Sequence, residues 1–196
     1  YLKDMQGTQY ADRLMNLAIR TWATAEPVKA LEWVNRSLNA SSRAALGQQI
    51  AEAWARTNPA EASAWLSSHA ADPVTTAMLE KALRTWGSTQ PEKVRDWLAS
   101  PAGAAAGSKA VPVAAAGMAV DNPSYAWNYL DESTRSKTGQ GIAAIESDTL
   151  LKTMGGAASQ YVESVSEVFR EWANESPDAA SEAAFGIRAA GLRDAA

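Results

Sequence analysis

The chain has 196 residues, 46% of them hydrophobic, which is enough apolar material to bury a continuous core. Its net charge is −4 and neither sign forms a long run, which argues against binding to a nucleic-acid backbone or through a polybasic membrane patch. The absence of cysteine excludes disulfides, zinc sites with thiolate ligands and a cysteine nucleophile, and no apolar run approaches the ~20 residues of a membrane span.

A proline recurs at a constant interval of 32 residues, and bulky residues flank it at constant offsets. The prolines are Pro27, Pro59, Pro91 and Pro123. Five positions before them stand Trp22, Trp54, Trp86 and Met118, and six positions after them stand Trp33, Trp65, Trp97 and Tyr129. A weaker fifth copy follows at Trp172 and Pro177. Constant spacing with matched chemistry is typical of a tandem helical repeat.

The segment before each proline has the apolar pattern of an amphipathic helix. Counted back from the flanking aromatic residue, positions −3, −4, −7 and −8 are almost always apolar; in the first copy they are Ile19, Ala18, Met15 and Leu14. This spacing places them on one helix face. Only Ser164, in the fifth copy, is polar. We expect the second of these helices to begin within Asn39 to Ser42, and the third at Asp72–Pro73.

Each proline of the series is expected to open a second helix. Proline suits the first helical position, where its missing N–H would have no partner within the helix. The residues immediately before it include Asn58, Asn122 and Ser176, which are good N-cap residues. Each unit is therefore predicted to be a hairpin of two antiparallel helices.

Two stretches interrupt the pattern. Residues 100–112 are rich in proline and glycine, so the first helix of the fourth unit is expected to start late or to kink. The interval between the fourth and fifth prolines grows to 54 residues. Within it we expect a loop over residues 133–141 and one extra helix over residues 142–154, ended by Gly155 and Gly156.

The predicted fold class is all-α, because no strand pattern is present. We expect a single α-solenoid domain, residues 1–196, of about five antiparallel helical hairpins. The predicted units are residues 8–39, 40–71, 72–100, 101–132 and 159–192, with an inserted loop and helix at 133–158.

The unit resembles the tetratricopeptide-like superfamily of α-solenoids. The resemblance rests on the paired helices, on a period close to 34 residues, and on small residues such as Ala62 where the two helices meet. It covers residues 8–132 and, more loosely, 159–192. The 32-residue period, and a proline between the two helices rather than after the second, depart from that family. The resemblance implies a right-handed superhelix whose first helices line a concave peptide groove. The unit is also similar to Ala- and Trp-rich helical repeats of large uncharacterised bacterial proteins, which implies no function.

Polar residues on the first helices are the candidate partner-binding site. Positions −2 and −6 stack on one helix face and form rows across successive units. We call the polar strip the residues Asn16, Arg20, Gln48, Glu52, Glu80 and Arg84. One interpretation is a groove in which the arginines hold carboxylates or carbonyls of a partner. The other is a solvated face with ion pairs such as Arg20–Glu52–Arg84, each of little energetic value.

Other candidates have a structural and a functional interpretation. The tryptophan pairs favour inter-helix core, with an aromatic platform for carbohydrate or peptide as the alternative. His69, the only histidine, is expected at a helix C-terminus, and without a second histidine or a cysteine it is a poor metal ligand. Glu146 and Asp148 in the insertion favour a solvated face, with a ligand site as the alternative. An enzyme is expected to gather these two carboxylates or His69 in a pocket.

The sequence favours a non-catalytic scaffold that binds a protein or peptide partner in a groove lined by the first helices. The alternatives are a structural spacer or assembly segment of a larger repeat protein and, more remotely, an enzyme or carbohydrate-binding module with a site at residues 133–156. No cofactor, metal, nucleic acid, membrane insertion or small-molecule ligand is expected. The chain starts at Tyr1, which suggests a processed product or fragment. We expect a soluble protein, and its composition suits either the cytoplasm or export after signal-peptide removal.

Overall fold

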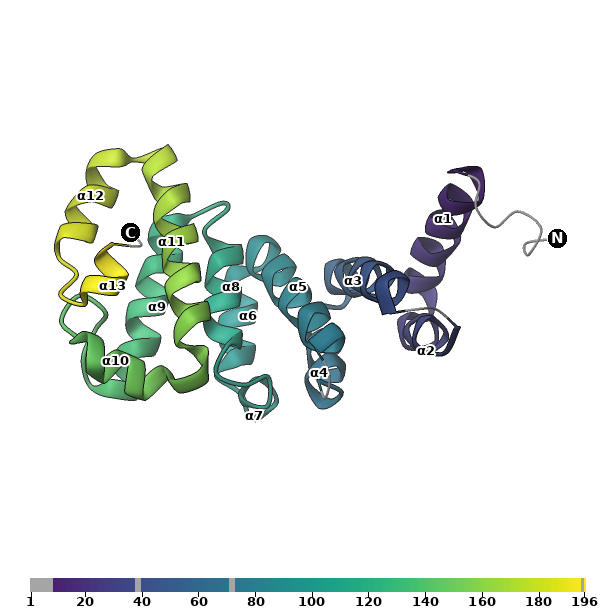
Figure 1. Cartoon of the computed structure of the whole chain (residues 1–196), viewed down its shortest axis with the longest axis horizontal. Coiled ribbons are helices and arrows are strands. Elements are labelled where there is room, and N and C mark those ends of the chain that lie inside the picture. The colour runs from purple at the N-terminus through teal and green to yellow at the C-terminus, as the bar shows by residue number, and fades with distance from the viewer. Residues whose placement is uncertain (1–8, 38–39, 71–72, 195) are drawn as a thin grey trace. The chain divides into compact units, whose positions relative to one another are not determined.

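The computed structural model describes residues 9–37, 40–70, 73–194 and 196, and it is helical throughout, with 82% helix and no strand in these ranges (Figure 1). The predicted all-α class is confirmed. The chain divides into two compact units, Tyr1–Ala82 and Leu83–Ala196, which we describe one after the other.

The prolines of the series each begin a helix, as predicted. These helices are α2 (Pro27–Ser37), α4 (Pro59–Ser68), α6 (Pro91–Leu98), α9 (Pro123–Thr138) and α12 (Pro177–Phe185). The residue before each proline forms a one-residue corner: its N–H donates to the carbonyl four positions back, at 2.7–3.0 Å, and its own carbonyl accepts from the N–H four positions ahead, at 3.0–3.1 Å. Proline disfavours helical geometry in the residue before it, so one residue leaves the helix and the next helix starts at once.

Backbone geometry, more than side-chain capping, shapes these corners. Asn58, Gln90, Asn122 and Ser176 share φ between −152° and −135° and ψ between 66° and 84°. The Asn122 side chain accepts a hydrogen bond from the Tyr125 N–H at 2.9 Å, so this predicted cap is confirmed. Asn58 and Ser176 occupy the predicted N-cap positions but form no capping bond through their side chains.

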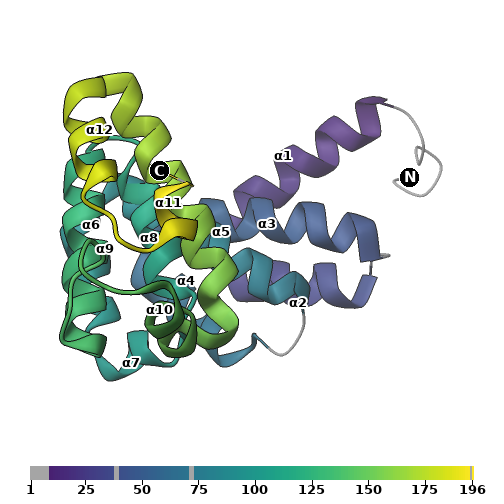
Figure 2. The ribbon, with the colours of Figure 1, turned by 60° about the vertical axis from the view of Figure 1, so that its left-hand side comes forward.

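In the first unit, α3 (Ala40–Thr57) packs against α1 (Gln9–Ala25), α2 and α4 (Figure 2). The helices α3 and α5 (Pro73–Thr89) begin within the expected segments, although Asn39 and Asp72 lie outside the described residues. The predicted tryptophan pairs meet inside their hairpins: the Trp22 and Trp33 rings lie 6.1 Å apart at 57°, and those of Trp54 and Trp65 lie 6.0 Å apart at 52°. These pairs are packing contacts between the two helices of a hairpin.

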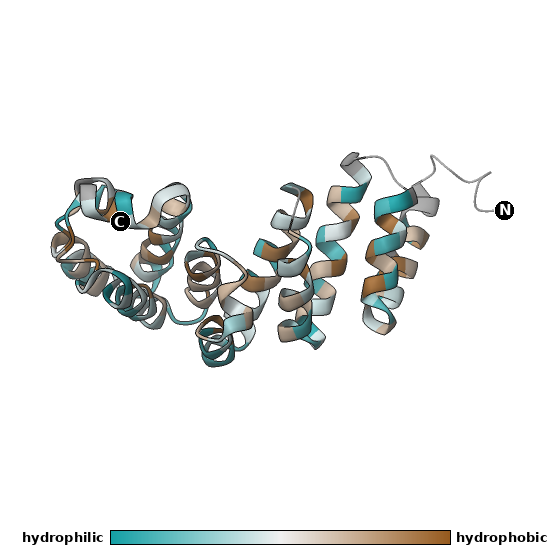
Figure 3. Cartoon of the chain, turned by 90° about the horizontal axis from the view of Figure 1, so that it is seen from below, coloured by the Kyte–Doolittle hydropathy of each residue, from teal (hydrophilic) through white to brown (hydrophobic). Residues whose placement is uncertain are grey.

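The second unit begins within α5, and α11 (Ala158–Glu175) packs there against α8 (Ala110–Met118), α9 and α12 (Figures 1 and 2). Trp86 and Trp97 repeat the pair geometry of the first unit, 5.4 Å apart at 49°. The short α7 (Pro101–Ala104) and the late start of α8 at Ala110 agree with the predicted interruption. The colouring in Figure 3 changes from hydrophobic to hydrophilic around single helices, as expected for amphipathic segments.

Two glycines allow close contact between α5 and α8. A Cβ atom on Gly87 would collide with the carbonyl oxygen of Ala114, and a Cβ atom on Gly117 would collide with that of Arg84. The arrangement is reciprocal, since each helix contributes one glycine and one carbonyl. Backbone-to-backbone contact of this kind requires residues without side chains at both positions.

The predicted loop over residues 133–141 was wrong for residues 133–138, because α9 continues to Thr138 and ends at Gly139 with φ 76°. Thr134 is fully buried and its hydroxyl donates to the Leu130 carbonyl at 2.8 Å while also bonding the Tyr161 hydroxyl of α11. This packing against α11 extends the helix. The extra helix is shorter than predicted: α10 spans Ser147–Met154, followed by a 3-10 turn, Gly155–Ala157, and the last short helix of the chain is α13 (Ala190–Arg193).

Candidate functional site

Two residues of the polar strip lie together in one cavity of the first unit. Arg20 of α1 and Glu52 of α3 line a cavity of about 220 Å³, which we call the α1–α3 cavity. The other lining residues are Thr24, Gln49, Ala53 and Arg56. Position −2 of α1 and position −2 of α3 are therefore neighbours in this unit.

The remaining strip residues lie elsewhere. Gln48 is exposed outside the cavity, and Glu80 is half-buried in α5. The side chain of Asn16 lies outside the described residues. Arg84 forms an ion pair with Glu167 of α11, inside the second unit.

The ion pairs of the strip differ from the predicted series Arg20–Glu52–Arg84. The Glu52 carboxylate pairs with Arg56 at 2.8 Å and with Lys81 at 3.3 Å. Arg20 has no ion-pair or side-chain hydrogen-bond partner among the described residues, and its side chain is exposed. The predicted pairs were wrong because Glu52 pairs with Arg56, one turn further along α3, and with Lys81, which lies three positions before Arg84 in α5.

Gln49 is the residue of this cavity that sequence reasoning missed. Its Oε1 atom is buried and has no hydrogen-bond partner in the part of the chain that the structure describes. A buried acceptor without a donor is unfavourable by about 1–3 kcal/mol. The spacing Gln49, Glu52, Ala53 and Arg56 is i, i+3, i+4, i+7, a helix-face pattern that could have identified it.

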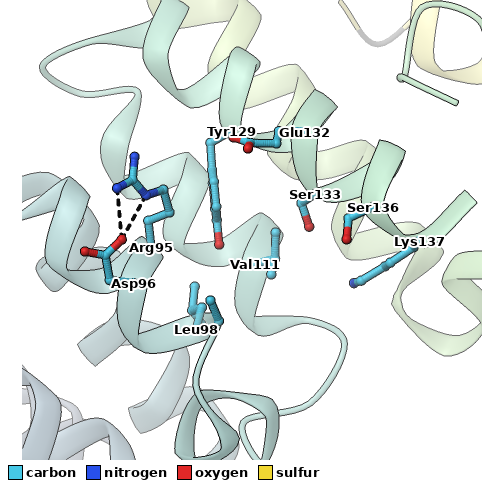
Figure 4. A pocket seen from close by; sticks show the side chains of 10 residues that line it. Arg95, Asp96, Leu98, Val111, Tyr129, Glu132, Ser133, Ser136 and Lys137 are labelled. Carbon is cyan, nitrogen blue, oxygen red and sulfur yellow. Dashed lines mark hydrogen bonds and ion pairs between the residues drawn. The ribbon is translucent and has the colours of Figure 1, made fainter. Parts of the chain in front are cut away.

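A larger cavity in the second unit was not anticipated. It measures about 380 Å³ and lies between α6, α8 and α9; we call it the α6–α9 cavity (Figure 4). Its lining residues are Arg95, Asp96, Leu98, Ala99, Val111, Tyr129, Glu132, Ser133, Ser136 and Lys137. Three of them belong to the part of α9 for which the sequence predicts a loop, which is why no pattern indicated the site.

In Figure 4 the Tyr129 side chain lies between the Arg95–Asp96 pair and the row of Ser133, Ser136 and Lys137. It is only 9% exposed, and its hydroxyl has no hydrogen-bond partner among the described residues. Burial, with a smaller contribution from Tyr125, raises the pKa of the Tyr129 phenol well above its usual value. The hydroxyl therefore stays protonated at neutral pH and is able to donate a hydrogen bond.

The acidic and basic groups at the other side of the α6–α9 cavity neutralise each other. Arg95 donates to Asp96 Oδ1 from Nε at 3.1 Å and from Nη2 at 2.9 Å (Figure 4). Its Nη1 donates to the Tyr125 hydroxyl at 3.3 Å. The Arg95 guanidinium is thus held in place by two neighbours.

The candidates for a catalytic role whose side chains the structure describes, His69 and Glu146, lie outside the two cavities. His69 ends α4, where Nδ1 lies 2.8 Å from the Trp65 carbonyl oxygen and the imidazole stacks on the Trp65 ring at 4.0 Å. Neither His69 nor Glu146 lines either cavity, and the side chain of Asp148 lies outside the described residues. Within the described ranges no three histidine or acidic side chains are grouped as metal ligands, and no helix there is long and apolar enough to cross a membrane.

Comparison with protein-family models, with curated proteins and with solved structures finds no match for this chain. Its function therefore has to be argued from the two cavities and their chemistry.

Proposed function

We propose that this chain is a non-catalytic scaffold of helical hairpins, arranged as a tetratricopeptide-like, right-handed α-solenoid, that binds a protein or peptide partner. The repetition of local geometry supports this architecture. The proline corner has the same hydrogen bonds at its five occurrences, and three successive tryptophan pairs have centroid distances of 5.4–6.1 Å. Stacked repeats of one unit build extended surfaces of the kind used for partner binding.

The observation that carries the binding proposal is that Arg20 and Gln49 line the same α1–α3 cavity and that neither side chain has a hydrogen-bond partner among the described residues. Arg20 offers an unpaired guanidinium, and Gln49 in the same lining has a buried amide oxygen without a donor, which a rotation of its side chain would turn toward a partner. A partner segment that places a carboxylate or a carbonyl at Arg20 and an N–H at Gln49 satisfies both groups. Peptides carry this combination in every residue.

The volume of this cavity favours a side chain over a free small molecule. Pockets for small molecules usually measure about 300–1,000 Å³, and this one measures about 220 Å³. It is large enough to hold one side chain or turn of a longer partner, whose remaining residues contact the surrounding helices.

The test is selection of a displayed random-peptide library on the full chain, followed by affinity measurements for the enriched peptides. We expect Arg20→Glu to weaken them roughly tenfold or more, because a charge-assisted hydrogen bond is replaced by repulsion. Gln49→Leu should also weaken them. The matched control is Arg170→Glu, which changes the same repeat position in α11, outside both cavities.

Two negative results of this experiment have different meanings. Peptides that bind wild type and Arg20→Glu equally well place the binding surface elsewhere. A library that yields no enriched peptide contradicts the scaffold proposal.

A second candidate, a spacer or assembly segment of a larger repeat protein, is favoured by apolar surface on two helices. Leu14, Met15 and Leu17 of α1 are 39%, 36% and 63% exposed, and Phe185 at the end of α12 is 83% exposed. Leu14 and Met15 belong to the face that the sequence predicts to be buried. Packing of another hairpin or a second copy would cover them. Sedimentation equilibrium of wild type and Leu17→Lys tests this, since self-association that the variant abolishes supports the assembly role.

A further inference from the structure

The α6–α9 cavity holds a cluster of hydrogen-bond donors that the scaffold proposal does not use. It lies in the second unit, whereas the α1–α3 cavity lies in the first, so a proposal about it can be tested independently of the scaffold proposal. At about 380 Å³ it is within the usual range for small ligands, although at its lower end.

The position of Tyr129 is unusual among the hairpins. The equivalent residues Trp33, Trp65 and Trp97 each contact the other tryptophan of their pair. Tyr129 instead directs a phenol hydroxyl into the cavity, with Val111 beside it (Figure 4). Tyr129 as a whole residue is nine-tenths buried, and its hydroxyl, which has no partner among the described residues, is left to donate to a ligand or water in the cavity.

Three more donors follow Tyr129 along the same face of α9. Ser133, Ser136 and Lys137 are four, seven and eight positions further on, a spacing that places them on one helix face. In Figure 4 the side chains of Ser133, Ser136 and Lys137 follow in a row on the other side of Tyr129 from Arg95 and Asp96. None of the three has a side-chain hydrogen bond or ion pair among the described residues.

The charges around the cavity select a monoanion. The Arg95 charge is taken up by Asp96, which leaves Lys137 as the unpaired cation of the lining. Glu132 lies at the upper edge of the cavity in Figure 4. A phosphate dianion brings one more negative charge than Lys137 can offset and is repelled more strongly by Glu132, whereas one carboxylate is matched by one ammonium group and neutral hydroxyls.

The rest of the wall is aliphatic. Leu98 and Ala99 come from the end of α6 and Val111 from α8. A ligand that fits both parts has a carboxylate at Lys137 and a short aliphatic group against these residues.

We propose that the α6–α9 cavity binds a carboxylate that carries a short branched aliphatic group, supplied by a free small carboxylic acid or by the C-terminal residue of a peptide. Lys137, Ser133 and the Tyr129 hydroxyl, which follow one another at intervals of one helical turn, hold the carboxylate, and Leu98 and Val111 contact the aliphatic group. This departs from the sequence-based expectation that the chain has no small-molecule ligand.

The test uses three isosteric probes on the full chain, followed by two-dimensional amide NMR. Isovalerate, isovaleramide and isoamylamine differ only in the head group. We expect isovalerate to cause saturable shifts at residues 95–99, 111 and 129–137, with the amide at least fivefold weaker and the amine without saturation. N-acetyl-glycyl-leucine and its C-terminal amide test the peptide source in the same way. Tenfold tighter binding of the peptide acid than of isovalerate identifies a chain terminus as the ligand, and the opposite order identifies a free acid.

Two conservative variants keep the proposal falsifiable. Lys137→Met should weaken isovalerate about tenfold and Tyr129→Phe about fivefold. The matched control for Lys137→Met is Lys93→Met on α6, which removes the same group outside the cavity. Equal binding of the amine and the acid, no saturable shift with any probe, or unchanged affinity in Lys137→Met would overturn the proposal. A failure here leaves the peptide-library result untouched, because that result depends on Arg20 and Gln49.

Discussion

Arg84 near the end of α5 forms an ion pair with Glu167 of α11, a residue 83 positions further along the chain. The two side chains are 37% and 19% exposed, so the pair is partly shielded from solvent. Sequence reasoning places Arg84 in a partner-binding strip. In the structure its charge is already used within the second unit, where it connects the end of α5 to α11.

The first prediction concerns the strength of this pair. A double-mutant cycle of Arg84→Met and Glu167→Gln should give a coupling free energy of about 1 kcal/mol. This is the upper end for surface pairs because Glu167 is largely shielded, and it is no larger because Arg84 is still more than a third exposed. The coupling should decrease in high salt. Arg170 and Glu171, 3.7 Å apart and more exposed, provide the control cycle, in which we expect almost no coupling. Urea unfolding of each variant measures both, and equal coupling in the two cycles would contradict the prediction.

A second prediction concerns the contact between α5 and α8. Gly117→Ala should lower the free energy of unfolding by about 1–3 kcal/mol, because the new methyl group collides with the Arg84 carbonyl and the two backbones must separate. At ordinary helix positions the same change stabilises by up to ~1 kcal/mol. Gly156→Ala, with no atom near its Cβ position, should change stability by less than about 0.5 kcal/mol. Chemical denaturation of the two variants gives the comparison, and an equal effect in both would rule out the close contact.

The third prediction tests the hairpin core. Trp54 is 1% exposed and contacts Trp65, so Trp54→Ala should cost about 3–5 kcal/mol. Trp54→Phe should cost less, because the buried indole N–H has no hydrogen-bond partner among the described residues and its removal leaves nothing unpaired. Thermal unfolding measures both, with Phe185→Ala as a control at an 83% exposed aromatic residue. Unchanged thermal stability in Trp54→Ala would contradict the packing described here.

The fourth prediction concerns alkaline pH. Burial raises the pKa values of Tyr129 and Tyr161 above those of exposed tyrosine, so the folded state holds these two protons more strongly than the unfolded state. Their contribution to stability is fully present below about pH 10, where unfolded tyrosines ionise, and is lost as the pH rises further. The unfolding free energy should therefore fall above that pH, by up to about 1.4 kcal/mol per pH unit for each tyrosine.

The measurement is denaturant unfolding across the alkaline range, together with tyrosinate absorbance of the folded chain. The double variant Tyr129→Phe/Tyr161→Phe should lose stability less steeply than wild type. An identical alkaline slope in the two proteins would show that neither phenol is responsible.

Local chemistry explains what could be predicted of the fold. A proline cannot donate to the helix ladder and restricts the residue before it, so Pro59 or Pro91 sets a helix start whatever surrounds it. The tryptophans five positions before and six after belong to the two helices that this corner joins, and their pairing follows from the turn itself. The prolines and glycines of residues 100–112 likewise disfavour regular helix through their own backbone preferences, and α8 starts only at Ala110.

Long-range packing decided what could not be predicted. Residues 133–138 are polar and were expected to form a loop, yet a hydroxyl contact between Thr134 and Tyr161 of another helix continues α9. Gln49 was passed over because the predicted strip used an offset one residue away; its spacing places it on one helix face with Glu52 and Arg56, and the position of α1 shows that this face lines the cavity.

The amino-acid sequence by itself determined the all-α class, the helix starts at the prolines and the tryptophan pairs, because each depends on residues within about ten positions of one another. The tertiary structure alone decided the partners of Arg84 and Glu52 and the α6–α9 cavity. These arise where helices distant in sequence meet, and a polar residue in a repeat gives no local signal that distinguishes an ion pair from a ligand site.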